Sequence, residues 1–186
     1  MEIVLASQSP RRKEILEEMG YSFLTEPARG DEILDESMDL NQRIEWVAYQ
    51  KAKEVQKNHE KACIIAADTV VVYGNEILGK PSTKEEAADY LADLSGEEHQ
   101  VKTGVCILFP KSEITFTETT SVYFKELSDA EILSYVQKGT CMDKAGAYGI
   151  QECDFVEKIK GSYSNVVGLP KEKVQSILEE FNVKKA

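Results

Sequence analysis

Cations at the start of a predicted helix are the first residues in this sequence that could do chemistry. Ser9 is a typical N-cap, and Arg11, Arg12 and Lys13 follow in the first helical turn. The amino end of a helix carries a partial positive charge, so each cation there costs about 0.3–1 kcal/mol unless an anion compensates. Backbone N–H groups, two guanidinium groups and the hydroxyls of Ser7 and Ser9 would suit a phosphate. A solvated basic turn is the alternative, and we assign Lys13 to it.

A lone carboxylate interrupts the most apolar stretch of the chain. Asp68 lies in the run 62–73, which otherwise consists almost entirely of small or β-branched residues and predicts a central strand. An unpaired buried carboxylate is costly, so Asp68 must be paired, bind a metal or face a cleft. We therefore interpret Asp68 as a catalytic or metal-binding residue, with a structural acceptor of backbone N–H groups as the alternative.

Weaker candidates each have a simple structural alternative. Glu32 lies in an acidic loop where carboxylates are usually solvated, and Lys51 could extend along its own helix to reach water. Lys80 precedes a proline and could merely close a hairpin region. The glycine-rich segment 142–151 allows a ligand to approach the backbone, but a plain turn is equally consistent, and Asp143 and Lys144 could form a surface salt bridge.

Hydrophobic spacing predicts the elements that must position these residues. Strands are expected at 3–6, 21–24, 62–73, 100–109, 113–124 and 155–159, and helices at 10–19, 40–57, 83–94, 128–138 and 170–181. Helices and strands interleave, but consecutive strands occupy the middle, which favours an α/β or α+β fold with a mixed sheet. No stretch resembles a linker between domains, so one domain over 1–186 is predicted.

Composition narrows the function classes. The 186 residues are 42% hydrophobic and 30% charged, with a net charge of −11, which is typical of a globular protein and unfavourable for binding nucleic acid or anionic membranes. No apolar run reaches the ~18 residues of a membrane span, and the first residues do not resemble a secretory signal, so a cytoplasmic protein is expected. The four cysteines lack a Cys-x-x-Cys spacing and are predicted to be reduced thiols.

Carboxylates with several cations, and no Ser/His or Cys/His nucleophile set, suit hydrolysis of a phosphoanhydride by metal-activated water. Mg²⁺ is the expected metal, because carboxylate and phosphate oxygens are its preferred ligands.

At these residues the chain resembles the Maf family of nucleoside triphosphate pyrophosphatases. The matching motifs keep the family's order and span nearly the whole chain: Leu5-Ala6-Ser7-Gln8-Ser9-Pro10-Arg11-Arg12, Ala67-Asp68-Thr69, Leu78-Gly79-Lys80-Pro81, Asp143-Lys144-Ala145-Gly146-Ala147-Tyr148-Gly149-Ile150-Gln151 and Val167-Gly168-Leu169-Pro170.

The resemblance implies a two-lobed α/β domain around a long mixed sheet, similar to the inosine triphosphate pyrophosphatases (a Maf/Ham1-like fold). It implies hydrolysis of a nucleoside triphosphate to the monophosphate and pyrophosphate, with Mg²⁺ or alternatively Mn²⁺. Asp68 matches the general base and, with Glu32, the metal ligands. Phosphate contacts are implied for Ser7, Arg11, Arg12, Lys51 and Lys80. Family members are often homodimers, and an arrest of cell division has been suggested for the family.

Arg11, Thr69 and Gln151 resemble the dTTP/UTP branch of the family at its specificity positions, rather than the 7-methyl-GTP branch. A Gln amide and a Thr hydroxyl can pair with O4 and N3–H of uracil or thymine. One departure follows Gln151, where Glu152-Cys153-Asp154 replaces a glycine-rich stretch and adds two negative charges. A pyrophosphatase for 7-methyl-GTP or another modified nucleotide, and a septation regulator without catalysis, are the alternatives.

Overall fold

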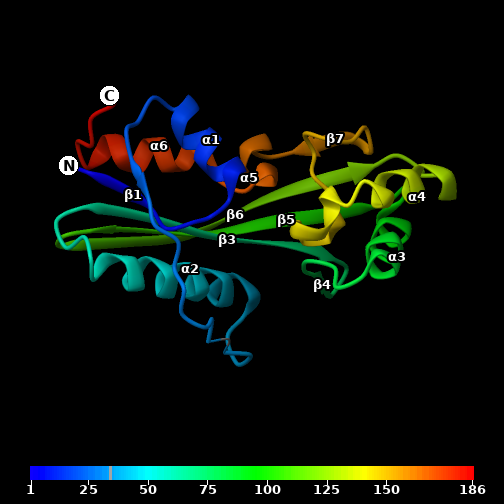
Figure 1. Cartoon of the computed structure of the whole chain (residues 1–186), viewed down its shortest axis with the longest axis horizontal. Coiled ribbons are helices and arrows are strands. Elements are labelled where there is room, and N and C mark those ends of the chain that lie inside the picture. Colours follow the sequence, from blue (N-terminus) through cyan, green and yellow to red (C-terminus); the bar gives the residue numbers. More distant parts are fainter. Residues whose placement is uncertain (34) are drawn as a thin grey trace. The chain divides into compact units, whose positions relative to one another are not determined.

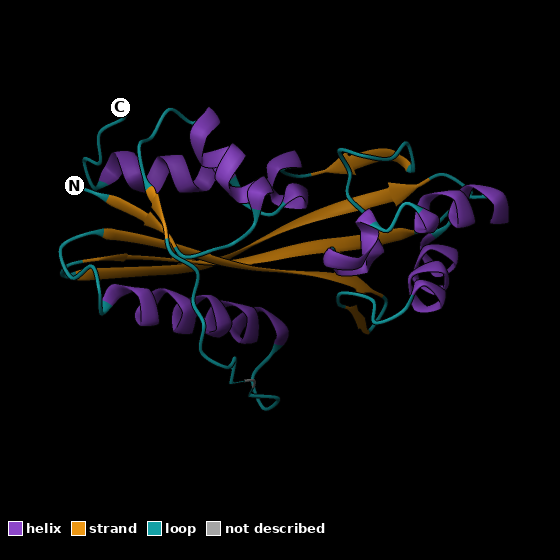
Figure 2. Ribbon diagram, in the orientation of Figure 1, coloured by secondary structure: helices purple, strands orange, loops and turns teal. Residues whose placement is uncertain are grey.

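We describe a computed structural model of the chain, which covers residues 1–33 and 35–186. Its elements, drawn in Figure 1 and coloured by type in Figure 2, are β1 Ile3–Leu5, α1 Pro10–Glu18, β2 Leu24–Thr25, α2 Leu40–Gln56, β3 Cys63–Tyr73, β4 Glu76–Leu78, α3 Lys84–Leu94, β5 Glu98–Phe109, β6 Ser112–Phe124, α4 Asp129–Gln137, the 3₁₀ turns η1 Thr140–Asp143 and η2 Ala145–Ala147, β7 Val156–Lys160, α5 Tyr163–Val167 and α6 Lys171–Glu180.

The strands pair in one mixed sheet. Over the described ranges its order is β2-β1-β3-β5-β6-β7, with β4 paired to β3. β1 runs parallel to β2 and β3, whereas β4 is antiparallel to β3 and β7 is antiparallel to β6. The predicted α/β fold with a mixed sheet is confirmed.

The chain divides into two compact units, as the two-lobed prediction requires. Unit 1 comprises residues 1–68, 103–118 and 168–186, and unit 2 comprises residues 69–102 and 119–167. The predicted site residues are therefore divided between two units, each of which has its own core.

In unit 1, α2 covers one side of the strands while α1 and α6 cover the other (Figure 1). The small side chains of Ala48 and Ala52 on α2 are fully buried against the sheet, together with Ile64 of β3. Gly104 of β5 permits this close packing, because a Cβ at that position would lie 2.6 Å from the carbonyl carbon of Ile44. The helix that carries Lys51 is thus seated directly on the strand layer.

On the other side of unit 1, buried Ile15 and Leu16 of α1 and Leu178 of α6 complete the apolar layer. The rings of Phe109 and Phe181 stack there with centroids 3.9 Å apart. These side chains bury the inner faces of α1 and α6 in the core of unit 1.

Unit 2 has an aromatic core under α3 and α4. Leu91 and Leu94 of α3 are buried beside Phe124 of β6, whose ring meets Tyr148 and Phe155 edge to face. Tyr148 belongs to the glycine-rich segment 142–151, so that segment is packed into the core of unit 2.

The second strand and the helix at 163–167 depart most from the predictions. The second strand is Leu24–Thr25 rather than 21–24, because its partner β1 is short and the register starts at Val4 opposite Leu24. The helix Tyr163–Val167 is not predicted by hydrophobic spacing. It is held instead by a buried amide, since Asn165 Nδ2 donates to the carbonyl of Val101 at 3.1 Å.

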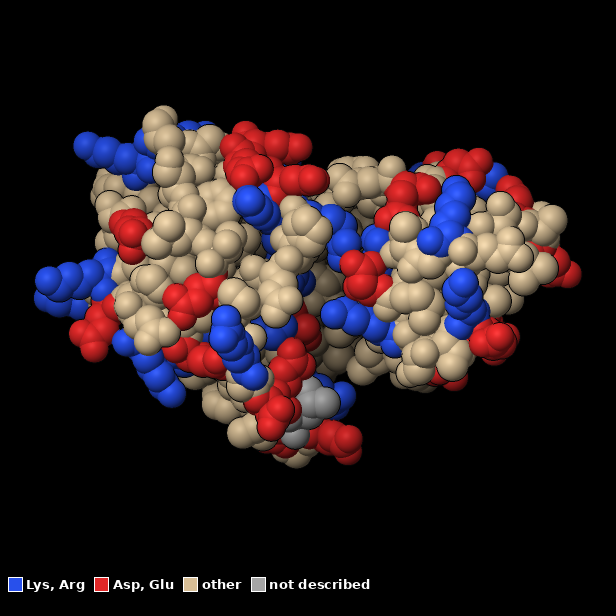
Figure 3. Space-filling view, in the orientation of Figure 1, with Lys and Arg blue, Asp and Glu red and all other residues tan. Residues whose placement is uncertain are grey.

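Surface charges and thiols follow the predictions from composition. Figure 3 shows acidic side chains gathered over the loop that precedes α2 and again over α1, with basic and acidic groups interspersed over other parts of this face. All four cysteines are free, and burial raises the pKa of Cys63 and of Cys106 to about 12. Across residues 1–33 and 35–186 we find no helix that is long and apolar enough to span a membrane.

Candidate active site

The amino end of α1 has the predicted cap without an acidic residue in its first turn. Ser9 Oγ accepts a hydrogen bond from Arg12 N at 3.3 Å, and Ser7 Oγ accepts one from Ser9 N at 3.1 Å. Both hydroxyls therefore organise the backbone at the point where the cations begin. The N-cap prediction is confirmed.

Arg12 is held in a fixed orientation within unit 1. Its Nε donates to the carbonyl oxygen of Gly168 at 2.8 Å, and its Nη1 donates to Ser7 Oγ at 3.3 Å. Burial lowers the pKa of the Arg12 guanidinium, against the opposing attraction of Asp68. A guanidinium has five N–H donors, and these two bonds fix the orientation of the group. Arg11, in the same turn, is half-buried.

Asp68 ends the part of β3 that belongs to unit 1, where it faces a lysine from α2. Lys51 Nζ lies 3.6 Å from Asp68 Oδ1 and 3.2 Å from Glu32 Oε1, and the side chains of Lys51 and Asp68 are only 21% and 24% exposed. A carboxylate in an apolar strand is thus accommodated by an ion pair at the edge of the core.

The electrostatics of Asp68 combine opposing effects. Burial raises the pKa of the Asp68 carboxyl and is the largest effect, while the charges of Lys51 and Arg12 lower it and that of Glu32 raises it. The net pKa is above the ordinary value for an aspartate. Such a carboxylate is a stronger base than a solvated one, as general-base catalysis requires.

Hydrogen bonds, ion pairs and charge interactions within unit 1 therefore bring together Ser7, Arg12, Glu32, Lys51 and Asp68. Lys51 and Glu32 pair with each other, and the Glu32 side chain is 49% exposed, so Glu32 is both solvated and paired.

The remaining predicted residues belong to unit 2. Thr69 is half-buried in β3, and Lys80 and Gln151 are exposed. The carbonyl of Gly79 accepts a hydrogen bond from the N–H of Gly146 at 3.1 Å, so the segments that carry Lys80 and Gln151 are joined directly.

Lys144 anchors the segment that ends at Gln151. Lys144 is only 8% exposed. Its Nζ lies 2.8 Å from Glu152 Oε1 and 3.0 Å from Asp143 Oδ1. The expected surface salt bridge is therefore largely buried at its lysine, and Glu152 is a partner that the sequence did not indicate. Gly149 N also donates to Tyr135 Oη at 3.0 Å.

The two extra carboxylates after Gln151 are both paired within unit 2. Glu152 binds Lys144, and Asp154 Oδ2 lies 3.3 Å from Lys125 Nζ. Their charges are thereby partly neutralised beside Gln151.

The donor set in unit 1 fits a hard divalent cation. Glu32 and Asp68 already converge on one positive group, the ammonium of Lys51. No group of three or more His, Cys, Asp or Glu suited to a metal occurs in the part of the chain that the structure describes. Two carboxylates still suffice for Mg²⁺, which commonly retains waters and substrate phosphates as its other ligands.

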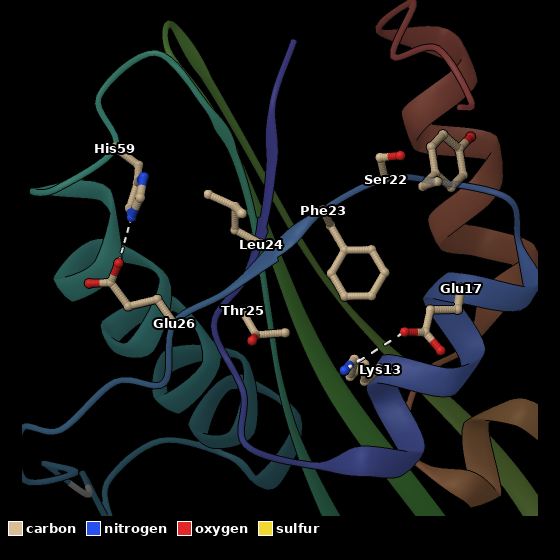
Figure 4. Close-up of a pocket in the computed structure, with 9 residues that line it drawn as sticks. Lys13, Glu17, Ser22, Phe23, Leu24, Thr25, Glu26 and His59 are labelled. Atoms are coloured by element: carbon tan, nitrogen blue, oxygen red, sulfur yellow. Dashed lines mark hydrogen bonds and ion pairs between the residues drawn. The ribbon is translucent and has the colours of Figure 1, made fainter.

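An open pocket of about 600 Å³ lies elsewhere in unit 1, beside β2 (Figure 4). Its described lining includes Lys13, Phe23, Leu24 and the hydrogen-bonded pair Glu26 and His59, and none of the predicted site residues. The assignment of Lys13 away from the phosphate position agrees with this placement.

The comparisons identify the class of protein. Residues 2–181 match the model of the Maf-like protein family, so the chain belongs to the Maf family.

Within that family the chain is 48% identical to the dTTP/UTP pyrophosphatase of Geobacillus sp., over 91% of this chain and 92% of that one. It is 43% identical to the dTTP/UTP pyrophosphatase of Bacillus pumilus, over 98% of this chain and 97% of that one. The Ham1 protein of Staphylococcus aureus has a similar fold, with a TM-score of 0.54 at 16% identity over 98% of this chain and all of that one (100%). The expected Ham1-like fold is confirmed.

Proposed function

We propose that this protein is a nucleoside triphosphate pyrophosphatase that hydrolyses dTTP and UTP to the monophosphate and pyrophosphate. The observation that carries the proposal is Asp68, a carboxyl of raised pKa held within 3.6 Å of Lys51. Membership of the Maf family and relatives named dTTP/UTP pyrophosphatase support the substrate class. These names favour neither 7-methyl-GTP hydrolysis nor a regulator without catalysis.

In the proposed reaction, Asp68 removes a proton from a water molecule, whose oxygen attacks the α-phosphorus. Pyrophosphate is the leaving group. Arg11 and Arg12, with Ser7 and the N–H groups that begin α1, bind the triphosphate, because this helix end lacks an acidic residue that would compete. Lys51 and Lys80 contact phosphate oxygens. Phosphoryl transfer depends mainly on positioning and charge neutralisation, which such a cation set supplies.

Glu32 and Asp68 would hold the divalent metal, with Mg²⁺ expected and Mn²⁺ as the alternative. The metal neutralises charge on the phosphate oxygens when it is bound. Thr69 and Gln151 would hydrogen-bond to O4 and N3–H of the pyrimidine, with Arg11 as a further specificity residue.

We further propose that residues 1–186 act as one catalytic domain, as a homodimer in the cytoplasm, where the enzyme removes excess or non-standard pyrimidine nucleotides. Sedimentation of the purified protein tests the dimer.

The reaction is tested by incubating the purified protein and Mg²⁺ with dTTP, UTP, CTP, ATP and 7-methyl-GTP. We expect pyrophosphate and monophosphate from dTTP and UTP at the highest kcat/KM. A preference for 7-methyl-GTP would overturn the base assignment, and no hydrolysis of any triphosphate would overturn the reaction.

A further inference from the structure

We propose that Gln50 and Glu54 of α2 are positioning residues that fasten the segment 29–33 and thereby present Glu32 to Lys51 and Asp68. The inference rests on the proposed function for its consequence, since Glu32 is there a metal ligand. Its structural basis is independent of that function, because it consists of hydrogen bonds within unit 1.

Gln50 holds both backbone groups of the residue next to Glu32. Its Oε1 accepts from Ile33 N at 3.1 Å, and its Nε2 donates to Ile33 O at 2.9 Å. Only a carboxamide offers a donor and an acceptor in this arrangement, so a carboxylate at position 50 would lose one of the two bonds.

Glu54 holds the other end of the segment. Its Oε1 accepts from Arg29 N at 2.6 Å, and its Oε2 accepts from Gly30 N at 3.0 Å. These backbone N–H groups lower the pKa of the Glu54 carboxyl. A Cβ on Gly30 would lie 2.8 Å from Glu54 Oε2, so a side chain at that position would displace the end of the Glu54 side chain.

The spacing of these residues explains how they act on Glu32. Gln50 and Glu54 are one helical turn apart on α2, and Lys51 follows Gln50 directly. We call Gln50 and Glu54 the clamp residues. The two positions that they hold, Gly30 and Ile33, lie on either side of Glu32. Its carboxylate is therefore fixed between two anchors while Lys51 pairs with it at 3.2 Å.

The segment 29–33 contains no helix or strand whose backbone hydrogen bonds would hold it. Residues 27–29 and 31–33 adopt neither helix nor strand, and Gly30 is a bend. The clamp residues lie outside the buried face of α2, which is formed by Ile44, Val47, Ala48, Ala52 and Val55. Their replacement should therefore free the segment without unseating the helix.

The test compares Gln50→Ala, Glu54→Ala and the double variant with Lys53→Ala. Lys53 is exposed on the same helix. Its Nζ donates to Gln56 Oε1 at 3.1 Å and lies over the ring of Tyr49, and neither residue belongs to the segment. Three quantities are measured: amide hydrogen exchange of residues 29–33, binding of Mn²⁺ alone by electron paramagnetic resonance, and hydrolysis as a function of Mg²⁺ concentration.

We expect exchange at Arg29, Gly30 and Ile33 to accelerate by about three- to tenfold for each clamp residue removed. The dissociation constant for Mn²⁺ should rise by about tenfold in the double variant, with kcat at saturating Mg²⁺ within about twofold of the parent. Glu54→Gln keeps an acceptor oxygen and should restore part of the protection.

Clamp variants that match Lys53→Ala in both exchange and Mn²⁺ affinity would overturn the inference. If the double variant fails to fold, hydrogen exchange and Mn²⁺ binding are measured in Glu54→Gln and in Gln50→Ala instead. Values that differ from those of Lys53→Ala uphold the inference, and values that match them overturn it. Altered exchange and Mn²⁺ binding in a protein that hydrolyses no triphosphate would uphold the clamp and refute the proposed function. Normal triphosphate hydrolysis with unaltered hydrogen exchange at residues 29–33 would uphold the proposed function and refute the inference about Gln50 and Glu54.

Discussion

Replacement of Asp68 by asparagine separates the proposed chemistry from the stability of the fold. Asn has nearly the same shape but cannot accept a proton from water at neutral pH. Lys51 keeps its partner Glu32 at 3.2 Å in the variant, so the lysine should remain in place. The substitution therefore removes one charge and one base while leaving the neighbouring ion pair.

The expected loss of activity follows from the role of a general base. Such a group contributes about 10²–10⁴-fold to the rate, or about 2.7–5.5 kcal/mol of activation free energy. Because Arg12 and Lys51 remain to bind phosphate, KM for dTTP at saturating Mg²⁺ should change by less than about threefold, while the Mg²⁺ concentration needed for activity should rise because Asp68 is also a proposed metal ligand. The loss should thus appear almost entirely in kcat.

The free energy of unfolding should not fall with the activity in Asp68→Asn, but should stay the same or rise. Burial raises the pKa of the Asp68 carboxyl, so the folded state favours the neutral acid more than the unfolded chain does. The stability contributed by the protonated form is complete below the unfolded pKa and is lost as the pH rises through the folded pKa. Asp68→Asn removes the cost of burying the ionised carboxylate, so at neutral pH the variant should be equally stable or more stable by about 0.5–2 kcal/mol.

The assay is pyrophosphate release from dTTP, with urea unfolding at neutral and at acid pH. Asp93→Asn, which removes an exposed carboxylate of α3, is the matched control and should retain activity. An Asp68→Asn protein with kcat within about tenfold of the parent would refute the general-base role. A variant less stable than the parent at neutral pH would refute the electrostatic reasoning.

Three further predictions concern other parts of the structure. The charge of Lys51 lowers the pKa of Asp68, so Lys51→Met should move the acid limb of the pH profile of kcat/KM to higher pH. An acid limb that does not move would mean that Asp68 does not determine this limb. Lys144→Met should lower the free energy of unfolding by about 1–3 kcal/mol, because Glu152 loses its partner, and adding Glu152→Gln should restore part of that loss in urea denaturation. Gly104→Ala should cost about 1–3 kcal/mol in the same assay, because α2 must move away from β5, and an unchanged midpoint would contradict the close contact with Ile44.

Some site residues were predictable from the sequence because they go against the usual residue preferences of a helix start or of a buried strand. Such an exception is visible without knowing the fold. Cations after Ser9 and a carboxylate in an apolar strand are both of this kind, and unit 1 places Arg12 and Asp68 where their charges interact. Element types were predictable for the same reason, since the periodicity of apolar residues is local. The start of β2 was not, because it depends on the register opposite Val4.

Supporting contacts between distant positions could not be predicted. Arg12 is oriented by the carbonyl of Gly168, at the far end of the chain, and Gln50 binds the backbone of Ile33 in an irregular segment. A hydrogen bond from a side chain to loop backbone leaves no periodic signal in the sequence. Glu54 had one indirect signal, its position one turn after Gln50 beside Lys51, but the backbone groups that it binds are defined only by the fold of the segment 29–33.

The balance of charges around Asp68 explains why a carboxylate in this strand can serve as a base. Pairing with Lys51 alone would stabilise the anion and make it a weak base, and burial alone would keep the group protonated. Burial and Glu32 raise the pKa of Asp68 while Lys51 and Arg12 lower it, and the net pKa is above the ordinary value, which makes the carboxylate a stronger base than a solvated aspartate. Anchoring of Glu32 by Gln50 and Glu54 belongs to the same balance, because a carboxylate free to leave would allow Lys51 to pair with Asp68 alone.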